Sequence, residues 1–426
     1  MKIYFYTLGC KVNQYETEAL REALQKNGHI SVGDGEAFDL AVINSCTVTA
    51  ESDRKTRQVL HRLRRQNENA VILLTGCMAQ VFGQNDFPDA DIIVGNTDIN
   101  KTVALAEEFF KTKQKITEIS PHTRKERYNT PSISDFSERT RAFMKIEDGC
   151  DRFCSYCIIP KARGFVRSKP LEEIKKEAER LSQKGFSEAV LVGINLSSYG
   201  KGEIYDLCDA VEAVCSAEGI KRVRLGSLEP DLITDEMLLR LKAQEKFCPQ
   251  FHLSLQSGCD RTLKRMNRHY DTAFYSDLAE RIRKIFPNCA VTTDIMVGFA
   301  GETEADFKES VEYLKEIGFA KAHVFAYSRR EGTVAYGLPN QITKNEKHRR
   351  SKIMLDAASE CEIKFLKTQI GTTQSVLFET EENGIYYGYS ENYSRVSVEF
   401  GEDLCGSIKA VQIIGLKNDT LMGKLL

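Results

Sequence analysis

Long apolar runs, proline and net charge are all scarce in this 426-residue sequence. Nowhere do about 18 consecutive apolar residues occur, which a membrane-spanning helix needs, so we expect no membrane contact. No basic stretch leads into a long apolar core near the start, so we expect no signal peptide and a cytoplasmic protein. Only 9 prolines, with 28% charged residues, argue against a disordered or fibrous chain. The net charge of −2 provides no overall field for nucleic acid, so any RNA contact must use local basic patches.

Cysteine, by contrast, is abundant, with 13 residues in the chain. Because the cytosol keeps thiols reduced, a disulfide framework is not expected in a protein without a secretory signal. The odd number also leaves at least one cysteine outside any full pairing. Metal binding or catalysis is therefore the leading explanation for the cysteines.

Residues 1–112 alternate short apolar runs with amphipathic stretches. This order predicts an α/β domain with a parallel sheet and crossover helices, of the flavodoxin-like kind. Strands are expected at 2–9, 41–45, 70–76 and 91–95, and helices at 14–27 and 51–66. Residues 113–140 lose this periodicity, are rich in Lys, Arg, Ser, Thr and Pro, and are interpreted as a linker.

A second alternating series covers residues 141–369. Its six strand–helix units predict a partial (β/α)6 barrel, related to the eight-unit barrel. Strands are expected at 141–146, 189–194, 222–227, 251–255, 290–297 and 322–328, and helices at 171–184, 232–242, 303–317 and 343–369.

Residues 370–426 change to the period of strands, with Gly and Asn turns, and predict a small antiparallel β-barrel of OB-like size. The five strands are expected at 373–378, 384–390, 394–400, 407–416 and 420–426. From residue 371 onward there are four Lys or Arg and eight Asp or Glu, so this barrel is acidic. Contact with RNA would then use unpaired bases stacked on tyrosines, although the tyrosines can equally fill strand positions. These are Tyr386, Tyr387, Tyr389 and Tyr393.

The sharpest motif is formed by Cys150, Cys154 and Cys157, directly after the first strand of the second series. Three thiolates within eight residues can hold three corners of a four-iron cluster and leave the fourth iron open to a substrate. The alternative is a structural zinc, but such sites usually have four ligands in paired spacings. The next cysteine is Cys208, too far along the chain to complete such a pair.

A second set of cysteines is spread over the first domain. Cys10, Cys46 and Cys77 follow its first three predicted strands. Because ligands gather at the carboxyl ends of parallel strands, all three should face one crevice. Each cysteine alone is more often a small buried residue, but three at equivalent positions favour a second metal site.

The first motif resembles the CxxxCxφC signature of the radical S-adenosylmethionine enzymes, with Tyr156 at the aromatic position. The resemblance implies that Cys150, Cys154 and Cys157 hold a [4Fe-4S] cluster whose open iron binds the methionine part of S-adenosylmethionine. It also implies reductive cleavage of that cofactor to a 5′-deoxyadenosyl radical. The cofactor carries the difficult chemistry, and the protein positions it.

Together, the two cysteine sets and the C-terminal barrel resemble the methylthiotransferase family over essentially the whole chain. The resemblance implies a second, auxiliary [4Fe-4S] cluster on Cys10, Cys46 and Cys77, which bears the sulfur to be transferred. It also implies that the C-terminal barrel is an RNA-binding TRAM domain. The expected partners are a tRNA with a modified adenosine, a low-potential electron donor of flavodoxin or ferredoxin type, and a sulfur donor.

The segment 8–18 most resembles the branch that methylthiolates carbon 2 of N6-threonylcarbamoyladenosine beside the tRNA anticodon. Alternatives are isopentenyladenosine in tRNA, a ribosomal-protein aspartate, or a cluster-bearing RNA-binding or redox-sensing protein without catalysis. Lys11 is a candidate determinant of substrate choice, because threonylcarbamoyl carries a carboxylate and isopentenyl does not. Arg163 or Arg330 are alternatives for the same role.

Candidate contacts to S-adenosylmethionine lie at the ends of predicted barrel strands, where such sites are built. Asn195, Glu229 and Gln256 occupy such ends, although each can equally cap a loop. Met296 and Gly298 belong to a segment that resembles the adenine-binding loop of the family, in which glycine permits close backbone approach.

Two basic patches are candidate RNA contacts, because phosphate binding uses clustered Lys and Arg. The first lies on the predicted helix after Cys46, and the second follows the radical motif. The alternative for a basic helix is a solvated face. The candidate residues are Arg54, Arg57, Arg62 and Arg65 in the first patch and Arg163 and Arg167 in the second.

Overall fold

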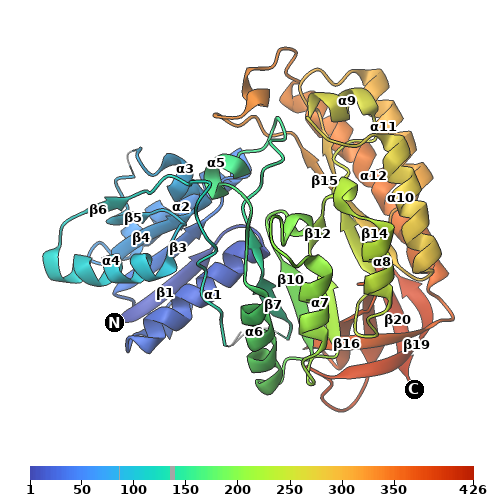
Figure 1. The fold of residues 1–426 in the computed structure, drawn as a ribbon, viewed down its shortest axis with the longest axis horizontal. Coiled ribbons are helices and arrows are strands. Elements are labelled where there is room, and N and C mark those ends of the chain that lie inside the picture. Colours follow the sequence, from blue (N-terminus) through green and yellow to red (C-terminus); the bar gives the residue numbers. More distant parts are fainter. Residues whose placement is uncertain (86, 135–139) are drawn as a thin grey trace.

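The computed structural model describes residues 1–85, 87–134 and 140–426. An N-terminal lobe and a larger C-terminal half lie side by side, and the last strands form a separate barrel below (Figure 1). Residues 135–139, in the predicted linker 113–140, lie outside the described part of the chain.

The N-terminal lobe is a parallel sheet of order β2-β1-β3-β4-β5-β6. Its core order is that of flavodoxin-like domains, as predicted. The strands are β1 (Lys2–Thr7), β2 (Ile30–Val32), β3 (Leu40–Ser45), β4 (Val71–Gly76), β5 (Ile92–Val94) and β6 (Ile116–Glu118). Prediction missed β2 and β6, which have three residues each, and β6 lies within the segment interpreted as a linker.

Helices cover both faces of this sheet. On one face, α1 (Lys11–Lys26) and α4 (Ile99–Thr112) bury Leu20, Leu24 and Val103 against the strands. On the other face lie α2 (Ala50–Gln66) and α3 (Cys77–Phe82). The Thr49 hydroxyl caps α2 by accepting a hydrogen bond from the Ser52 amide at 3.1 Å, which fixes where the helix begins.

The second part is the predicted partial barrel. All six expected strands form, in two parallel sheets of order β11-β10-β7 and β12-β13-β14-β15. Only Gly226 separates β11 from β12, so one segment of chain passes from the first sheet to the second. The strands are β7 (Ala142–Lys145), β10 (Glu188–Val192), β11 (Arg222–Leu225), β12 (Ser227–Leu228), β13 (Gln250–Leu253), β14 (Ala290–Val297) and β15 (Lys321–Ala326).

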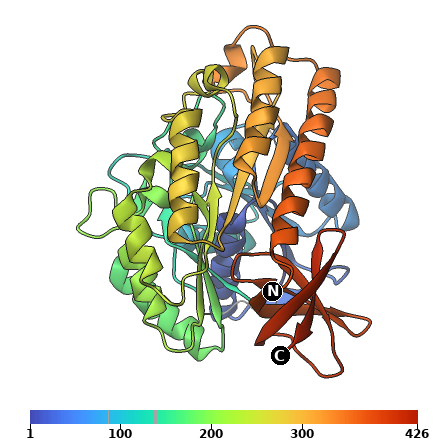
Figure 2. The ribbon, with the colours of Figure 1, turned by 90° about the vertical axis from the view of Figure 1, so that its right-hand side faces the viewer.

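Helices pack on the outside of this barrel, with α10, α11 and α12 side by side on its outer surface (Figure 2). A two-stranded ribbon of β8 (Glu147–Asp148) and β9 (Arg167–Ser168) flanks the radical motif. The helices are α5 (Ile159–Arg163), α6 (Leu171–Gln183), α7 (Leu207–Cys215), α8 (Asp235–Lys242), α9 (Asp260–Arg265), α10 (Thr272–Ile285), α11 (Glu304–Ile317) and α12 (Lys344–Thr368).

The C-terminal segment forms a closed five-stranded barrel of order β16-β17-β18-β20-β19. All five predicted strands are present. One pairing differs from the antiparallel expectation, because β18 and β20 run parallel where the barrel closes. The strands are β16 (Thr373–Glu382), β17 (Ile385–Ser390), β18 (Arg395–Glu399), β19 (Ile408–Lys417) and β20 (Thr420–Leu425).

Across the described ranges, every helix is too short or too polar to cross a membrane.

Candidate active site

The structure brings the three N-terminal cysteines together at one edge of the first sheet. Cys10 precedes α1, Cys46 follows β3 and Cys77 opens α3, and their strands are adjacent. Burial raises the pKa of the Cys77 thiol to about 12, the nearby Arg163 cation opposes this rise, and Cys46 and Cys10 add to it. The three sulfur atoms are thus close enough to influence one another electrostatically.

Asn13 supports this triad from the first turn of α1. Its Oδ1 accepts a hydrogen bond from the Cys10 thiol at 3.4 Å. Its amide nitrogen donates to Asn44 Oδ1 at 3.0 Å and to the Ser45 carbonyl at 3.1 Å, on the loop that leads to Cys46. Asn13 was not among the predicted site residues, although residues three apart on a helix share a face and its spacing from Cys10 could have indicated it.

Arg163 and Arg167 are not on the surface, and the prediction that they form a basic patch for RNA is wrong. Their side chains are 0% and 6% exposed. Arg163 is paired with Glu16 of the N-terminal lobe, and Arg167 with Asp148 and Glu126. Their charges neutralise buried carboxylates between the lobes and are not available to phosphate.

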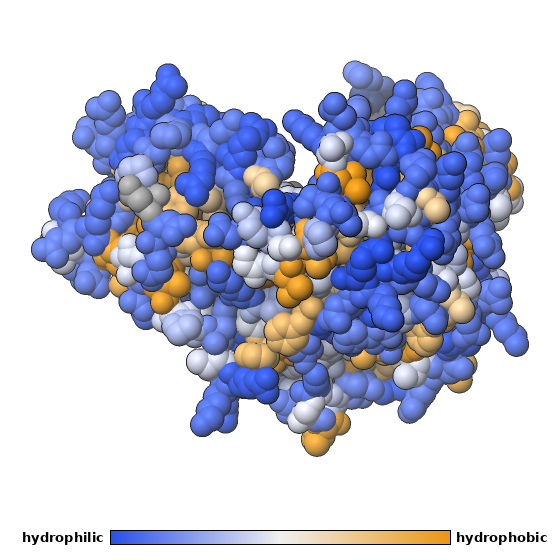
Figure 3. Space-filling model, turned by 90° about the horizontal axis from the view of Figure 1, so that it is seen from above, coloured by the Kyte–Doolittle hydropathy of each residue, from blue (hydrophilic) through white to orange (hydrophobic). Residues whose placement is uncertain are grey.

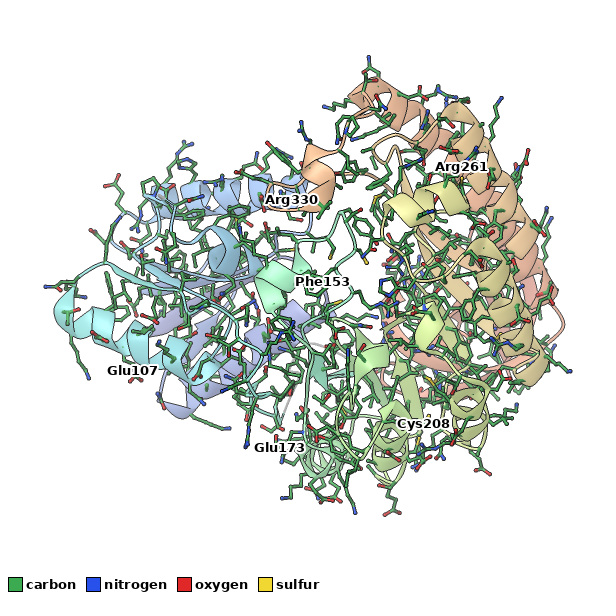
Figure 4. The ribbon with its side chains drawn as sticks, turned by 45° about the horizontal axis from the view of Figure 1, so that its top comes forward. Glu107, Phe153, Glu173, Cys208, Arg261 and Arg330 are labelled. Atoms are coloured by element: carbon green, nitrogen blue, oxygen red, sulfur yellow. The ribbon has the colours of Figure 1, made fainter. Side chains whose placement is uncertain are left out.

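The second triad lies on the loop after β8, where Cys150, Cys154 and Cys157 are all partly buried. The side chain of Arg268, which is 3% exposed, donates from Nη1 to Cys154 Sγ at 3.2 Å. Phe153 has a left-handed backbone (φ 51°) and is 52% exposed, and it lies near the junction of the two lobes (Figure 4). No pattern in the sequence indicated the role of Arg268.

In the part of the chain that the structure describes, neither triad has all three sulfur atoms within 4.8 Å of one another. Sulfur atoms around a single tetrahedral zinc, each about 2.3 Å from the metal, would be about 3.8 Å apart. As they stand, the sulfur atoms of neither triad are all at the spacing that a single tetrahedral zinc requires.

The predicted cofactor contacts differ in what their side chains do. Asn195 donates from its side-chain amide to the Ser198 side-chain Oγ at 2.7 Å, within the turn that follows it. Glu229 forms an ion pair with Arg268 and so holds the residue that faces Cys154. Gln256 has a left-handed backbone (φ 70°), and its buried Oε1 has no hydrogen-bond partner among the described residues.

The aromatic and glycine positions lie close to these groups. Tyr156 packs edge-on against Phe299 with ring centroids 6.3 Å apart, and Met296 belongs to the same apolar cluster. Gly298 has φ 71°, and its amide donates to Glu302 Oε2 at 2.7 Å. A Cβ atom at Gly298 would lie 2.4 Å from the Lys347 side chain, so this loop depends on glycine.

A cavity of about 970 Å³ occupies the interior of the partial barrel. All three parts of the chain line it: Cys10 and Lys11 from the N-terminal lobe, inward-facing barrel residues such as His252, and Tyr389 and Tyr393 from the C-terminal barrel. We call this cavity the lumen. Its size is at the upper end of the range of small-molecule sites.

Lys11 lies in the wall of the lumen beside Cys10. Burial, together with the nearby Arg141 and Arg224 cations, lowers its pKa to about 8. Its ammonium lies 5.9 Å from the centroid of the Phe143 ring. Among the residues that the structure describes, no carboxylate oxygen lies within 4.0 Å of this ammonium.

The C-terminal tyrosines mostly serve the packing of the barrels. Tyr386 fills the interior of the C-terminal barrel. Tyr389 and Tyr393 stack with ring centroids 4.7 Å apart, and Arg141 lies over both rings. Tyr387 lies under Arg395.

The four candidate arginines of α2 are exposed, as expected, although some have partners. Arg54 pairs with Glu51, and Arg57 and Arg62 lie over the Phe87 and Tyr6 rings. The contact of Arg54, Arg57, Arg62 and Arg65 with RNA stays a prediction.

Arg330 joins the two lobes. It donates to Thr47 Oγ1 at 2.6 Å and pairs with Asp53 Oδ2 at 2.7 Å, reaching from the loop after β15 to α2 (Figure 4). Thr47 directly follows Cys46, so this contact fixes the loop of the first triad. Seen from above, the surface is hollowed between the lobes, and apolar side chains lie near the middle of this face as well as at several places toward its edges (Figure 3).

Comparison with known families matches this architecture. Residues 144–314 match the radical SAM superfamily, and residues 2–96 match the uncharacterized protein family UPF0004. The radical S-adenosylmethionine methyltransferase TsrM from Kitasatospora setae shares the fold, with a TM-score of 0.56 over 91% of this chain and 77% of that chain at 12% identity. The fold and the site thus define a radical SAM enzyme, a class that implies a [4Fe-4S] cluster and S-adenosylmethionine.

Full-length relatives narrow this class. The chain is 38% identical to threonylcarbamoyladenosine tRNA methylthiotransferase MtaB of Bacillus subtilis, over 97% of this chain and 93% of the relative. It is 36% identical to the protein of that name from Thermotoga maritima, over 97% and 94%. It is 34% identical to tRNA-2-methylthio-N(6)-dimethylallyladenosine synthase of Pelotomaculum thermopropionicum, over 100% and 98%. The chain belongs to the radical SAM methylthiotransferase family.

Proposed function

We propose that this protein transfers a methylthio group to carbon 2 of N6-threonylcarbamoyladenosine in tRNA. The names of the relatives at 38% and 36% identity support this substrate over dimethylallyladenosine. The observation that carries the choice is Lys11, whose partly buried ammonium lines the lumen beside Cys10 without a carboxylate partner among the described residues.

The chemistry of the threonylcarbamoyl group fits this wall of the lumen. Its carboxylate needs a cation when it leaves water, because an unpaired buried charge is costly. The neighbouring Arg141 and Arg224 are engaged with Glu379 and Glu188, whereas Lys11 has no such partner among the described residues. An isopentenyl group, which is apolar, would leave this ammonium unpaired in the loaded lumen.

We assign the radical cluster to Cys150, Cys154 and Cys157, and an auxiliary cluster to Cys10, Cys46 and Cys77. Both triads fit such a group, because each has a buried guanidinium that donates to one of its sulfur atoms and can offset thiolate charge. When bound, S-adenosylmethionine and the two clusters supply the methyl group, the sulfur and the radical chemistry by which methylthio replaces hydrogen on carbon 2.

The chain itself orients the reactants. The unpartnered Gln256 Oε1 and the Gly298 loop are suited to hold S-adenosylmethionine, with Tyr156 and Met296 as apolar support. Asn195 and Glu229 position the surrounding loops and Arg268.

Other partners follow from the reaction. Radical formation requires one electron from a low-potential donor, of flavodoxin or ferredoxin type, and each product consumes one sulfur atom from a donor. We infer that the C-terminal barrel acts as a TRAM-like RNA-binding domain and that the exposed arginines of α2 contact tRNA phosphates.

Iron content tests the two clusters. Anaerobically reconstituted protein should hold about eight irons, four in each cluster. Replacing Cys150, Cys154 and Cys157 with Ala should leave about half, and replacing Cys10, Cys46 and Cys77 should leave the other half. The second variant should still form 5′-deoxyadenosine but no methylthiolated RNA. Zinc in either triad, or methylthiolated product from the second variant, contradicts the assignment.

Substrate choice is tested with two tRNA pools, one carrying threonylcarbamoyladenosine and one carrying isopentenyladenosine. We expect methylthiolation of the first pool, and a loss of about tenfold or more in Lys11→Met, as for a lost charge-assisted hydrogen bond. Lys26→Met removes an exposed lysine at the other end of the same helix and should leave the rate unchanged. Modification of the isopentenyl pool alone, or of a ribosomal protein with neither pool modified, contradicts the proposal.

A further inference from the structure

Arg163 occupies the space between the two cysteine triads. Its helix, α5, lies at the junction of the N-terminal lobe and the barrel (Figure 1). The guanidinium is fully buried, and its Nε donates to Cys77 Sγ at 3.2 Å. Its Nη2 donates to Glu16 Oε2 at 2.9 Å, and its Nη1 lies 3.5 Å from Asp148 Oδ1. Two carboxylates from different lobes therefore hold the guanidinium against one sulfur atom.

The backbone beside Arg163 connects to the other triad. The carbonyl of Gly164 accepts a hydrogen bond from the Cys150 amide at 2.9 Å. A Cβ atom at Gly149 would lie 2.0 Å from the Phe165 carbonyl, so the two segments are packed backbone to backbone. This short segment therefore contacts a ligand of each triad, one through the Arg163 side chain and one through the Gly164 carbonyl.

A hydrogen bond to a ligand sulfur changes the properties of an iron–sulfur cluster. It withdraws negative charge from the sulfur and stabilises the reduced form, which carries one more electron, so the reduction potential rises. Arginine suits this role because its planar guanidinium stays charged and can bind a sulfur and two carboxylates at once. Burial strengthens the effect, because little water screens the charge.

We propose that Arg163 is a positioning residue that fixes Cys77 and raises the reduction potential of the auxiliary cluster. This inference rests on the proposed auxiliary cluster. The Arg163 guanidinium holds a ligand of the auxiliary cluster, and the carbonyl of the next residue, Gly164, accepts from the Cys150 amide, so the end of one short helix contacts both sites.

The chain offers a matched control in Arg167. Its guanidinium belongs to the same buried network, with Asp148 at 3.2 Å and Glu126 at 3.2 Å. Its hydrogen bonds within the described residues go to oxygen atoms, not to sulfur. Replacing Arg167 therefore removes an equivalent buried cation without removing a contact to a cluster ligand.

The test compares Arg163→Gln, Arg163→Lys and Arg167→Gln in the full-length, anaerobically reconstituted protein. Iron content and EPR-monitored redox titration report each cluster separately. In Arg163→Gln we expect a more negative potential for the auxiliary cluster, with the radical cluster and formation of 5′-deoxyadenosine retained. Arg163→Lys keeps the charge in the network and should give a smaller shift, and Arg167→Gln should give none.

Two results would overturn the inference in different ways. Equal auxiliary potentials in the wild type and both Arg163 variants would refute the role of Arg163 while leaving the two-cluster proposal intact. If the variant without Cys10, Cys46 and Cys77 holds as much iron as the wild type, the auxiliary cluster itself is refuted. If Arg163→Gln does not fold, the auxiliary reduction potentials of Arg163→Lys and Arg167→Gln are compared with that of the wild type. A shift in Arg163→Lys that is absent in Arg167→Gln supports the inference, and equal potentials in both variants contradict it.

Discussion

Gly76 determines where Cys77 can lie. It has φ 90°, a conformation that L side chains rarely adopt, and it joins β4 to α3. A Cβ atom there would lie 2.4 Å from Asn44 Oδ1 and 2.5 Å from the Ser45 carbonyl. The close approach of the strand ends that carry the cysteines is thus possible only because this residue has no side chain.

Gly76→Ala should therefore lower the free energy of unfolding by about 2 kcal/mol or more, as strain and a backbone clash combine. The iron held by the N-terminal triad should fall as well. Gly28→Ala is the control, because Gly28 also has a positive φ (82°) but has nothing within 4 Å of the added atom. Urea unfolding and iron analysis measure both effects, and equal losses in the two variants would contradict the argument.

The residues whose positions could be predicted from the sequence are those whose positions depend on local structure. The N-terminal cysteines followed strands that could be recognised as buried runs, so their convergence was predictable. The burial of Arg163 was not, because its partner Glu16 lies 147 residues away in the chain. A basic side chain next to a motif is interpreted as part of a surface patch unless the carboxylate that pairs with it from another lobe is known.

At the scale of elements, some long periodic segments were predicted nearly to the residue, whereas α4 and α10 had no expected range. The last barrel helix was expected at 343–369 and is formed by Lys344–Thr368. The three-residue strands β2 and β6 were not predicted, because so short a run has no recognisable periodicity. They are stabilised by pairing with the neighbouring strands β1 and β5. The division of the chain into domains stays a prediction.

Contacts between β10, β11 and the C-terminal barrel centre on Glu188. Its side chain is 1% exposed and pairs with Arg222 and Arg224. Those arginines donate to the carbonyls of Tyr389 and Glu391 at 3.0 and 2.9 Å. One buried carboxylate thus pairs with two of the cations that attach the C-terminal barrel.

Glu188→Gln should cost about 3–5 kcal/mol of stability, the usual loss when a buried ion pair is broken. Burial alone would raise the pKa of Glu188, but Arg224 and the other arginines lower it below its ordinary value of 4.5. Its contribution is therefore complete above that value and is lost as the pH falls through the lower folded-state pKa.

The unfolding free energy of the wild type should accordingly fall more steeply below about pH 4.5 than that of Glu188→Gln, by up to about 1.4 kcal/mol per pH unit. Glu179→Gln, at an exposed position of α6, should follow the wild type. Denaturant titrations at several pH values measure these slopes, and parallel curves for wild type and Glu188→Gln would contradict the assigned pKa shift.

At the scale of the whole molecule, buried arginines join the three parts. Arg163 connects the N-terminal lobe to the radical motif, Arg224 connects the barrel to the C-terminal strands, and Arg330 connects the loop after β15 to α2. Each belongs to one part and meets oxygen atoms of another. The lumen, whose wall comes from all three parts, depends on these contacts for its shape.

Arg330 allows this dependence to be measured without touching a cluster ligand. Arg330→Gln removes the ion pair with Asp53 and weakens the hold on Thr47, next to Cys46. We expect faster amide hydrogen exchange at residues 47–53 and 328–337, because the contact between the lobes opens more often. Methylthiolation should fall while 5′-deoxyadenosine still forms, since the radical site stays intact but the lobes no longer hold the substrate between them.

Arg329→Gln is the control, because Arg329 is exposed and donates to the Tyr336 carbonyl of its own loop at 2.8 Å. It should leave both the exchange at 47–53 and the ratio of product to 5′-deoxyadenosine unchanged. A ratio that stays constant in Arg330→Gln as well, with slower or equal exchange, would mean that the lobes are held together without this ion pair. A ratio that falls in Arg330→Gln alone ties productive transfer to the closed arrangement of the two lobes.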